Sequence, residues 1–355
     1  MNYKIVNIRT SAKVDPKDSV LIIYTGGTFG MAFDKDGSLA PFNFGRVIEM
    51  IPELKGLELR LTVISFPEAR DSANIQHTDW DNIAYIIYEN YTQYDGFVIL
   101  HGTDTMAYTA SALSYMLKNL NKPVILTGAQ IPIGYIRSDA RENLLTALEI
   151  ATAKQNGHPI VNEVCIYFNL VLLRGNRSSK IRSSTFAAFQ TKNYPVLAES
   201  GINIEYNHSF MATHNPDAKI KIVRGFDENV VILKVFPSIS EAVVKAILNT
   251  KGLQGVVLET FGSGNTMNFP WFLKLIERAL KKDIIIYNVS QCSGGEVLQG
   301  RYETSKRLKE LGVLGGGDIT TEAAITKMMF LLGTEKNKSL VRKKLIKPLN
   351  GEMDE

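Results

Sequence analysis

Short runs of apolar residues, each ended by glycine or polar residues, recur along the first half of the chain. Continuous runs of about four to eight apolar residues are typical of parallel strands that are buried on both faces. The pattern predicts five strands, at residues 20–24, 59–65, 96–100, 124–127 and 164–168. Residues 1–17 precede the first run and are interpreted as a polar lead-in.

Apolar residues between these runs return at the spacing of an amphipathic helix. Trp80, Ile83 and Ile87 fall on one face of a helix predicted over residues 79–93. A second helix is predicted over residues 138–155, where leucines recur at the same spacing. Strands that alternate with helices of this length indicate βαβ units around a parallel sheet.

The pattern is interrupted over residues 201–224, which are polar and show no clear periodicity. We expect a linker there, between an α/β catalytic domain at 18–200 and a second α/β domain at 225–347. The second domain is expected to contain strands at 230–235, 255–258 and 284–289 and helices at 240–249, 270–281 and 321–332. The predicted fold is therefore α/β, with a larger N-terminal doubly wound, mainly parallel sheet domain and a smaller C-terminal α/β domain.

The composition excludes several classes of protein. Of 355 residues, 45% are hydrophobic and 21% are charged, which is ordinary for a globular chain and unlike collagen, coiled coils or disordered proteins. The net charge of +4 is too weak over this length to indicate nucleic-acid binding. The one basic cluster fits the solvated face of a final surface helix and comprises Lys336, Lys338, Arg342, Lys343, Lys344 and Lys347.

Few features of the chain bear on its compartment. Cys165 and Cys292 are far apart in sequence, which favours a reducing compartment over a disulfide. The N-terminal residues lack the apolar core of a secretory signal, and no apolar run approaches the ~18 residues of a membrane helix. We expect a soluble cytoplasmic protein with no membrane and no nucleic-acid partner.

Ligands of open α/β sheets bind beyond the carboxyl ends of the strands, so the residues that follow each strand are the most informative. After the first predicted strand, Gly26 and Gly27 allow a sharp turn and a close approach of a ligand to the backbone. Residues 25–30 match neither the phosphate loop, which needs a lysine, nor the dinucleotide fingerprint. A nucleotide-binding protein is therefore disfavoured, and a plain turn stays open as the alternative.

Two further loops are rich in polar side chains. Residues 70–74 follow the second predicted strand, and residues 101–105 follow the third. The spacing leaves two interpretations of Asp104 open: it orients a substrate amine or a lysine, or it caps the helix that starts near residue 106. His101 ends an apolar strand and is interpreted as structural rather than as a base.

Lys180 lies among hydroxyl side chains in the loop after the fifth predicted strand. A lysine acts as a base only where burial or a neighbouring charge lowers its pKa, and surface lysines are far more common. The chain has no G-x-S-x-G elbow, and its 5 histidines show no metal-binding spacing, so serine-hydrolase and zinc chemistry are disfavoured. Hydroxyl nucleophiles with a lysine and an aspartate remain.

Three motifs together resemble the bacterial-type L-asparaginases, and the chain is most similar to their cytoplasmic, type I branch. The motifs are TGGT at 25–28, HGTDT at 101–105 and GNRSSK at 175–180. They occur in the right order at the ends of predicted strands, and the resemblance extends over residues 19–332. It implies an amidohydrolase that converts L-asparagine to L-aspartate and ammonia, with variable activity on L-glutamine.

The resemblance also implies catalytic roles for four residues in a two-step reaction. Thr28 matches the threonine nucleophile that forms an acyl-enzyme intermediate. Thr103 matches a second catalytic threonine, which Lys180 and Asp104 support through hydrogen bonds. Neither a metal nor an organic cofactor is expected.

Substrate-binding residues are implied in the same way. Asp71 and Ser72 match the loop that holds the α-carboxylate, and Asp104, beside Thr103, would also receive the α-ammonium. Asn265 resembles a residue that reaches the site of a neighbouring subunit. We therefore expect a small amino-acid substrate and a homodimer or homotetramer with sites shared between subunits.

One departure from the family concerns a mobile loop that we expect over residues 31–43. The family usually carries a tyrosine in this loop, hydrogen-bonded to the nucleophile, and residues 31–43 contain none. Either Ser38 with water takes its place, or Thr28 is activated by another group. The departure bears on how the nucleophile is activated more than on the reaction class.

Several alternatives stay open. A glutaminase-asparaginase differs only in room for one methylene, worth about 1–3 kcal/mol. An amidase component for tRNA-linked amide transfer usually carries an added N-terminal domain, for which residues 1–18 are too short. A non-catalytic amino-acid sensor on the same fold needs the anchoring residues but not Thr28 and Lys180, so their presence disfavours it.

Overall fold

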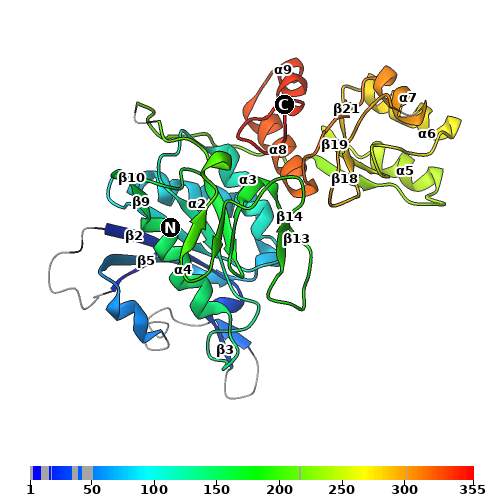
Figure 1. The fold of residues 1–355 in the computed structure, drawn as a ribbon. Coiled ribbons are helices and arrows are strands. Elements are labelled where there is room, and N and C mark those ends of the chain that lie inside the picture. The colour runs from blue at the N-terminus through cyan, green and yellow to red at the C-terminus, as the bar shows by residue number, and fades with distance from the viewer. Residues whose placement is uncertain are drawn as a thin grey trace. The chain divides into compact units, whose positions relative to one another are not determined.

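The computed structural model describes residues 3–8, 16, 18–33, 39–41, 51–215, 217–301 and 303–355. The chain divides into two compact units (Figure 1). Unit 1 comprises Met1–Thr191 and Pro195–Ile222, and unit 2 comprises Lys192–Tyr194 and Val223–Glu355. The chain therefore enters unit 2 briefly, returns to unit 1, and then enters unit 2 again.

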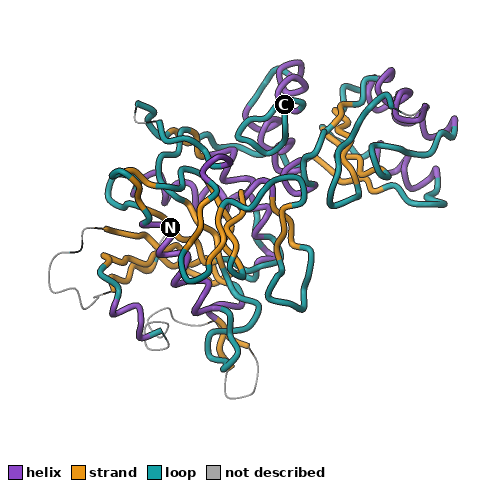
Figure 2. The backbone as a smooth tube through the Cα atoms, viewed as in Figure 1, coloured by secondary structure: helices purple, strands orange, loops and turns teal. Residues whose placement is uncertain are grey.

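The core of unit 1 is a nine-stranded sheet with parallel strands at its centre. Figure 2 draws the strands in orange. Strands β5, β2, β6, β8 and β11 are parallel, and antiparallel strands flank them on both sides. The parallel strands β2, β6, β8 and β11 are almost completely buried, which explains their continuous apolar runs. Across the sheet the order is β1 (Lys4–Ile8), β5 (Leu59–Arg70), β2 (Asp18–Gly26), β6 (Gly96–Leu100), β8 (Val124–Thr127), β11 (Val164–Phe168), β12 (Val171–Arg174), β15 (Ala198–Ser200) and β16 (Ile204–Tyr206).

The order of the parallel strands creates a switch point. Numbered along the chain, the five strands lie in the order 2-1-3-4-5, because β5 lies on one side of β2 and β6 on the other. Doubly wound sheets of this order bind ligands beyond the strands where the order reverses. In unit 1 the reversal places together the β5 loop (71–74), the β2 loop (27–30) and the β6 loop (101–105).

Three α-helices are found among the described residues of unit 1: α2 (His77–Asn90), α3 (Met106–Met116) and α4 (Ala140–Thr152). Helix α4 packs on β2, β6 and β8, and α3 packs on β11. A capping box formed by Gln76 and Asp79 starts α2. The Trp80 indole N–H donates to Thr109 Oγ1 of α3 at 3.0 Å and so joins these two helices. The helices predicted over 79–93 and 138–155 correspond to α2 and α4.

Two segments of unit 1 differ from the expectation. The lead-in contains β1, an edge strand in which only Ile8 is buried. Residues 201–222 of the expected linker contribute β16 to the sheet, and the division between the units falls after Ile222. Short edge strands bury too few side chains to give a periodic pattern, which is why the sequence does not reveal them. The remaining short elements are β3 (Met31–Phe33), β4 (Leu39–Pro41), β7 (Leu117–Lys118), β9 (Lys154–Gln155), β10 (His158–Pro159), β13 (Ser178–Lys180), β14 (Phe189–Thr191), β17 (Lys221–Ile222) and the 3₁₀ turns η1 (Thr28–Gly30), η3 (Pro52–Gly56), η4 (Ser72–Asn74), η5 (Gly175–Arg177) and η6 (His208–Phe210).

Unit 2 is built on a four-stranded parallel sheet. Buried side chains of its strands and helices, among them Leu258, Phe272 and Ile286, form one core. The predicted class is confirmed: a larger doubly wound, mainly parallel sheet unit is followed by a smaller α/β unit. The elements of unit 2 are β18 (Val230–Lys234), α5 (Glu241–Leu248), β19 (Gly255–Thr260), α6 (Pro270–Lys281), β20 (Ile285–Ser290), α7 (Glu303–Leu311), β21 (Leu314–Gly315), α8 (Thr321–Thr334) and α9 (Lys338–Leu345).

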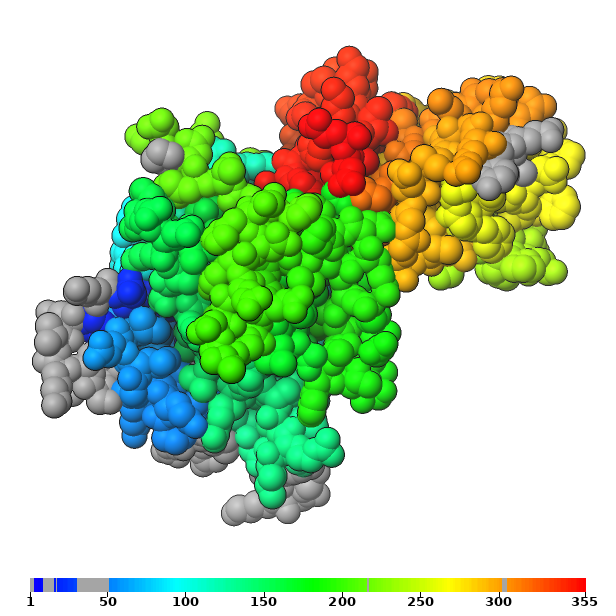
Figure 3. Space-filling view, viewed as in Figure 1, coloured from blue at the N-terminus to red at the C-terminus, as the bar shows by residue number. Residues whose placement is uncertain are grey.

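A buried ion pair holds the C-terminal segment inside unit 2. The Lys327 ammonium of α8 lies 2.6 Å from Glu352 Oε1, and both side chains are completely buried. The ammonium also donates to the carbonyl oxygens of Leu345 at 2.9 Å and Lys347 at 2.7 Å. Burial lowers the pKa of Lys327, and the Glu352 carboxylate opposes that shift. Figure 3 shows the C-terminal residues, in red, gathered in one mass of side chains.

The structure also places the basic cluster and the two cysteines. The predicted basic cluster lies on and around α9, where Arg342 pairs with Asp283 and Lys344 with Glu335, each at 2.7 Å. The thiols of Cys165, which is buried, and Cys292, which is exposed, are both free. In the described part of the chain no helix has the length and apolarity to cross a membrane.

Candidate active site

The β5, β2 and β6 loops pack on one another, and glycine makes the contacts possible. A Cβ at Gly27 would overlap Gly102 Cα, so the β2 and β6 loops touch backbone to backbone. A Cβ at Gly102 would lie 2.6 Å from Ser72 Oγ of the β5 loop. Gly27 also has a φ of +83°, and its N–H donates to Arg70 O at 3.0 Å. Any side chain at Gly27 or Gly102 would push the loops apart, so these glycines fix the geometry of the site.

Thr28 begins the turn η1 in the β2 loop and is half-buried. Because Gly27 packs on Gly102, Thr28 is carried next to the β6 loop. The side chain of Tyr24 lies against the same turn, since a Cβ at Gly30 would overlap Tyr24 Oη. Burial raises the pKa of Tyr24 to about 12, so the phenol stays protonated at neutral pH. The turn that carries Thr28 therefore rests on a phenol that only glycine at position 30 can accommodate.

Lys180 bridges two residues of the β6 loop. Its Nζ donates to Thr103 Oγ1 at 2.7 Å and to Asp104 Oδ1 at 2.6 Å. The Lys180 side chain is only 15% exposed, so it is not an ordinary surface lysine. Charge-assisted hydrogen bonds of this length are among the stronger interactions in proteins. They hold the Thr103 hydroxyl in place and offset the charge of Asp104.

Gln130 belongs to the same cluster, and the sequence analysis missed it. Thr103 Oγ1 donates to Gln130 Oε1 at 3.2 Å, and Gln130 Nε2 donates to Thr185 O at 3.0 Å. The Asp139 carboxylate accepts the Gln130 backbone N–H at 3.0 Å and so fixes its main chain. Gln130 follows β8, the strand next to β6, so the rule that sites form beyond parallel strands could have found it.

The two interpretations of Asp104 can now be separated. Helix α3 begins at Met106, and its N-cap residue is Thr105 rather than Asp104. Thr105 Oγ1 donates to Ser72 O at 2.7 Å, which ties the β6 loop to the β5 loop. Asp104 instead binds Lys180, and its side chain is 65% exposed. The carboxylate is therefore oriented by the lysine and remains open to a ligand.

Asp71 and Ser72 differ in what they present to the site. Asp71 is the N-cap of η4, and its carboxylate accepts the Ala73 N–H at 3.0 Å. Ser72 is buried against Gly102. The carboxylate of Asp71 is thus engaged within its own loop, and the Ser72 hydroxyl lies closer to the β6 loop.

His101 is completely buried beneath the β6 loop. Its Nδ1 lies 2.7 Å from Gly102 O and its Nε2 lies 2.9 Å from Thr109 Oγ1. A carbonyl oxygen only accepts, so Nδ1 carries the proton and Nε2 accepts the Thr109 hydroxyl. Burial lowers the pKa of His101 to about 4, which agrees with a neutral ring. His101 is structural, as expected, and orients the Gly102 carbonyl next to Thr103.

Two predicted parts of the site are not among these unit 1 residues. Asn265 belongs to unit 2, in the turn after β19, where its carbonyl accepts the Phe261 N–H at 2.8 Å. Ser38 lies outside the described residues, as does most of the expected mobile loop over residues 31–43. The described parts of that loop form β3 and β4, which pair antiparallel.

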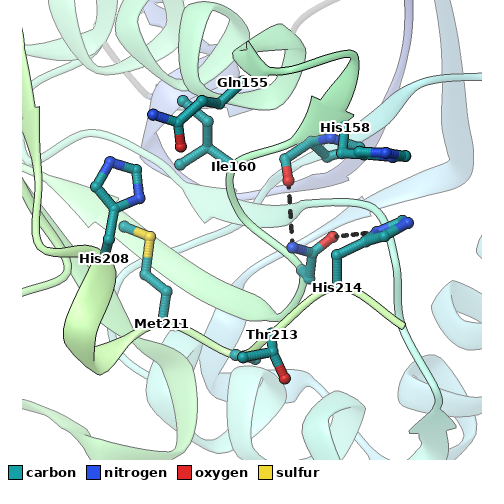
Figure 4. Close-up of a pocket in the computed structure, with 10 residues that line it drawn as sticks. Gln155, His158, Ile160, His208, Met211, Thr213 and His214 are labelled. Atoms are coloured by element: carbon teal, nitrogen blue, oxygen red, sulfur yellow. Dashed lines mark hydrogen bonds between the residues drawn. The ribbon is translucent and has the colours of Figure 1, made fainter. Parts of the chain in front are cut away.

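Another cavity of unit 1 collects histidines that are distant in sequence (Figure 4). Its volume is about 220 Å³. The rings of His158 and His214 lie with their centroids 4.6 Å apart, and His208 faces them across the cavity. His214 Nδ1 lies 3.4 Å from Asn162 Oδ1. Within the described residues, no group of three or more His, Cys, Asp or Glu side chains could hold a metal ion.

Both units match models of known protein families. Residues 19–212 match the model described as asparaginase, N-terminal, and residues 229–345 match the glutaminase/asparaginase C-terminal domain. Among solved structures, L-asparaginase I from Vibrio cholerae superposes with a TM-score of 0.85 at 39% identity, covering 95% of this chain and 99% of that one.

Two relatives align over nearly the whole of this chain. L-asparaginase 1 of Escherichia coli K12 is 39% identical over 339 residues, which cover 95% of this chain and 98% of the relative. The human 60 kDa lysophospholipase is 36% identical over 363 residues, which cover 96% of this chain but 62% of that protein. Since the family models match most of both units, the chain belongs to the glutaminase/asparaginase family.

Proposed function

We propose that this protein hydrolyses L-asparagine to L-aspartate and ammonia. The observation that carries the proposal is the cluster of Thr103, Asp104 and Lys180 at the switch point of the sheet, beside the turn that carries Thr28. The identity of 39% to an L-asparaginase over nearly the whole chain supports the same reaction class.

The proposed reaction has two steps. Thr28 Oγ1 attacks the carbon of the side-chain amide, the carbon–nitrogen bond breaks, and ammonia leaves with the threonine proton. Water then attacks the resulting ester, aspartate leaves, and a proton returns to Thr28. Both steps need groups that pass protons to and from the reacting oxygen.

Thr103 is the proposed proton-passing group. Its hydroxyl accepts from Lys180 and donates to Gln130, so both the oxygen and the proton have fixed directions. The Lys180 ammonium stabilises the Thr103 oxygen as it loses a proton, and Asp104 offsets the charge of the lysine.

The α-amino-acid head group is proposed to bind at the β5 and β6 loops. The Asp104 carboxylate, 65% exposed beside Lys180, suits the α-ammonium. The Ser72 hydroxyl suits the α-carboxylate, because the carboxylate of Asp71 is already bonded to the Ala73 N–H. The Asp104 carboxylate would then bind the α-ammonium of the substrate, and the Ser72 hydroxyl would donate to its α-carboxylate.

We further infer that copies of the chain assemble, with Asn265 of one copy contributing to the site of another. Exposed aromatic side chains in unit 2 support this inference. Phe236 and Phe261 follow the neighbouring parallel strands β18 and β19 and are 52% and 38% exposed. Large apolar side chains exposed together are typical of protein interfaces. We propose the cytoplasm as the compartment, which the free thiols of Cys165 and Cys292 support.

Ammonia release from L-asparagine and from L-glutamine tests the function. We expect release from asparagine by the native chain and a loss of at least about 10³-fold in kcat for Thr28→Ala and for Lys180→Met. Thr28→Ser, which keeps a hydroxyl, serves as the matched control and should retain part of the activity. Saturable asparagine binding without ammonia release would identify a sensor instead.

Complementation tests the shared site. Thr28→Ala and Asn265→Ala subunits are each expected to be weakly active, whereas a refolded mixture should regain up to about a quarter of the native activity if sites are shared between two subunits. Light scattering gives the oligomeric state of the same samples. A monomer, or a mixture no more active than its parts, contradicts the shared site and leaves the chemistry in unit 1 unaffected.

A further inference from the structure

A second cavity of unit 1 adjoins the Thr103 cluster. Its volume is about 490 Å³, which is within the range of small-molecule sites. Gln130 lines this cavity and is also the residue that accepts the Thr103 hydroxyl, so the cavity begins one side chain away from the proposed catalytic cluster. We call it the β8 cavity; its lining comprises Gln130, Ile131, Arg137, Ser183, Ser184, Thr185 and Phe186.

The order of the strands sets the direction from the site to the β8 cavity. Ser72, Thr28, Thr103 and Gln130 follow β5, β2, β6 and β8, which are consecutive neighbours in the sheet. The β5 loop contacts the β6 loop directly, since Thr105 Oγ1 donates to Ser72 O at 2.7 Å, and Thr103 of the β6 loop in turn contacts Gln130 after β8.

This row of contacts places the leaving group of the substrate toward β8. With the α-carboxylate at Ser72, the scissile amide lies between the β2 and β6 loops. Any substituent on the amide nitrogen then continues along the row, past Gln130 and into the β8 cavity. Ammonia needs only the volume of a water molecule, about 30 Å³, so a cavity of about 490 Å³ offers far more room than the small leaving group needs.

The lining indicates which substituent the cavity suits. Arg137 forms no ion pair or hydrogen bond with any residue that the structure describes, and neither does the hydroxyl of Ser183 or Ser184. A guanidinium beside hydroxyl groups is a common arrangement for binding a carboxylate. Ile131 and Phe186 add an apolar wall, which suits a short carbon chain between the amide and that carboxylate.

We propose that the β8 cavity is a leaving-group subsite for asparagine derivatives whose amide nitrogen carries a short carboxylate, with β-aspartyl-glycine as the simplest example. The proposal rests on the proposed function. Thr28 attacks the β-carbonyl, the carbon–nitrogen bond breaks, and glycine leaves with the threonine proton. Water then releases aspartate from the same ester that asparagine forms, so no co-reactant is needed.

The experiment compares aspartate release from three substrates: L-asparagine, β-aspartyl-glycine and β-aspartyl-methylamide, whose substituent is uncharged. The native chain is expected to cleave β-aspartyl-glycine with a kcat/KM at least tenfold above that of the methylamide. Arg137→Gln should remove this preference and change asparagine hydrolysis by less than twofold. Arg182→Gln, which removes an exposed arginine outside the lining, is the matched control and should leave all three rates unchanged.

The outcomes separate the two proposals. Hydrolysis of asparagine without release of glycine from β-aspartyl-glycine overturns the subsite and leaves the asparaginase function intact. Equal preferences in the native chain and Arg137→Gln also overturn it. If asparagine itself is not hydrolysed, the proposed function fails, and the subsite fails with it unless β-aspartyl-glycine is cleaved, which would make it the substrate.

Discussion

The buried ion pair of unit 2 gives a quantitative prediction for Glu352→Gln. The substitution keeps the size of the side chain but removes its charge, and so leaves the Lys327 ammonium without a counter-ion in a completely buried position. Breaking a buried pair by removing one partner costs about 3–5 kcal/mol. Two carbonyl acceptors remain for Lys327, those of Leu345 and Lys347, which places the ion-pair term near the lower end of that range.

A second contribution increases the loss of unfolding free energy that we expect for Glu352→Gln. The two Glu352 oxygens accept the backbone N–H groups of Leu349, at 2.9 and 3.0 Å, and Asn350, at 2.8 Å. The amide group of glutamine would present its own donors to one of these N–H groups and leave it unsatisfied, at a cost of about 1–3 kcal/mol. We therefore expect a total loss of about 4 kcal/mol, or a decrease in the Tm of unit 2 of roughly 10–15 °C.

Calorimetry of the native chain and the variant measures this decrease, with Glu335→Gln as the matched control. Glu335 pairs with Lys344 at 2.7 Å on the surface of the same unit, where solvent screens the pair, so its loss should change the Tm very little. In Lys327→Met/Glu352→Gln no charge is left buried, and we expect this double variant to be more stable than Glu352→Gln alone. Equal Tm values for Glu352→Gln and Glu335→Gln would refute the reasoning.

Two further predictions concern the β6 loop. Gly102→Ala should lower kcat/KM for asparagine at least about 100-fold, because its Cβ would lie 2.6 Å from Ser72 Oγ and displace the loop; kinetics beside Gly134→Ala, whose Cβ meets nothing within 4 Å, checks this. Burial lowers the pKa of His101 from 6.5 to about 4, so the unfolded chain binds the proton first as the pH falls. The contribution of His101 to the free energy of unfolding is complete above pH 6.5. It falls by about 1.4 kcal/mol for each pH unit between pH 6.5 and about pH 4. Urea unfolding at pH 7 and 5 should show a smaller pH dependence for His101→Asn than for the native chain.

The buried strands of the fold could be predicted from sequence, and the edge strands could not. Strands β6, β8 and β11 have the predicted bounds because every residue in them is buried, which gives an uninterrupted apolar run. In β1 only Ile8 is buried, so its contribution to the sheet depends on pairing with β5 rather than on its own pattern. The same holds for β16, which lies in what the sequence suggests is a linker.

Only part of the candidate site could be predicted from the sequence. The resemblance to the asparaginases was the basis for placing Thr103, Asp104 and Lys180 together, because Lys180 is separated from Asp104 by 76 positions in sequence. Gln130 carries no motif, and only its place after β8 connects it to Thr103. The roles of all these site residues stay predictions, and the described contacts do not join Thr28 or Asn265 to Lys180.

The ion pair that holds the C-terminal segment also orders events during synthesis. Unit 1 is complete once Ile222 has been made, but the buried ion pair of unit 2 needs Glu352, which is 130 residues later. At about 5–20 residues per second, the ribosome takes roughly 6–26 s to cover that distance. During this interval unit 1 can fold, whereas unit 2 is incomplete, and even after Lys327 has been made its counter-ion is still 25 residues away. Ribosome-bound chains that stop before residue 352 should therefore contain a protease-resistant unit 1 and a unit 2 that is still digested.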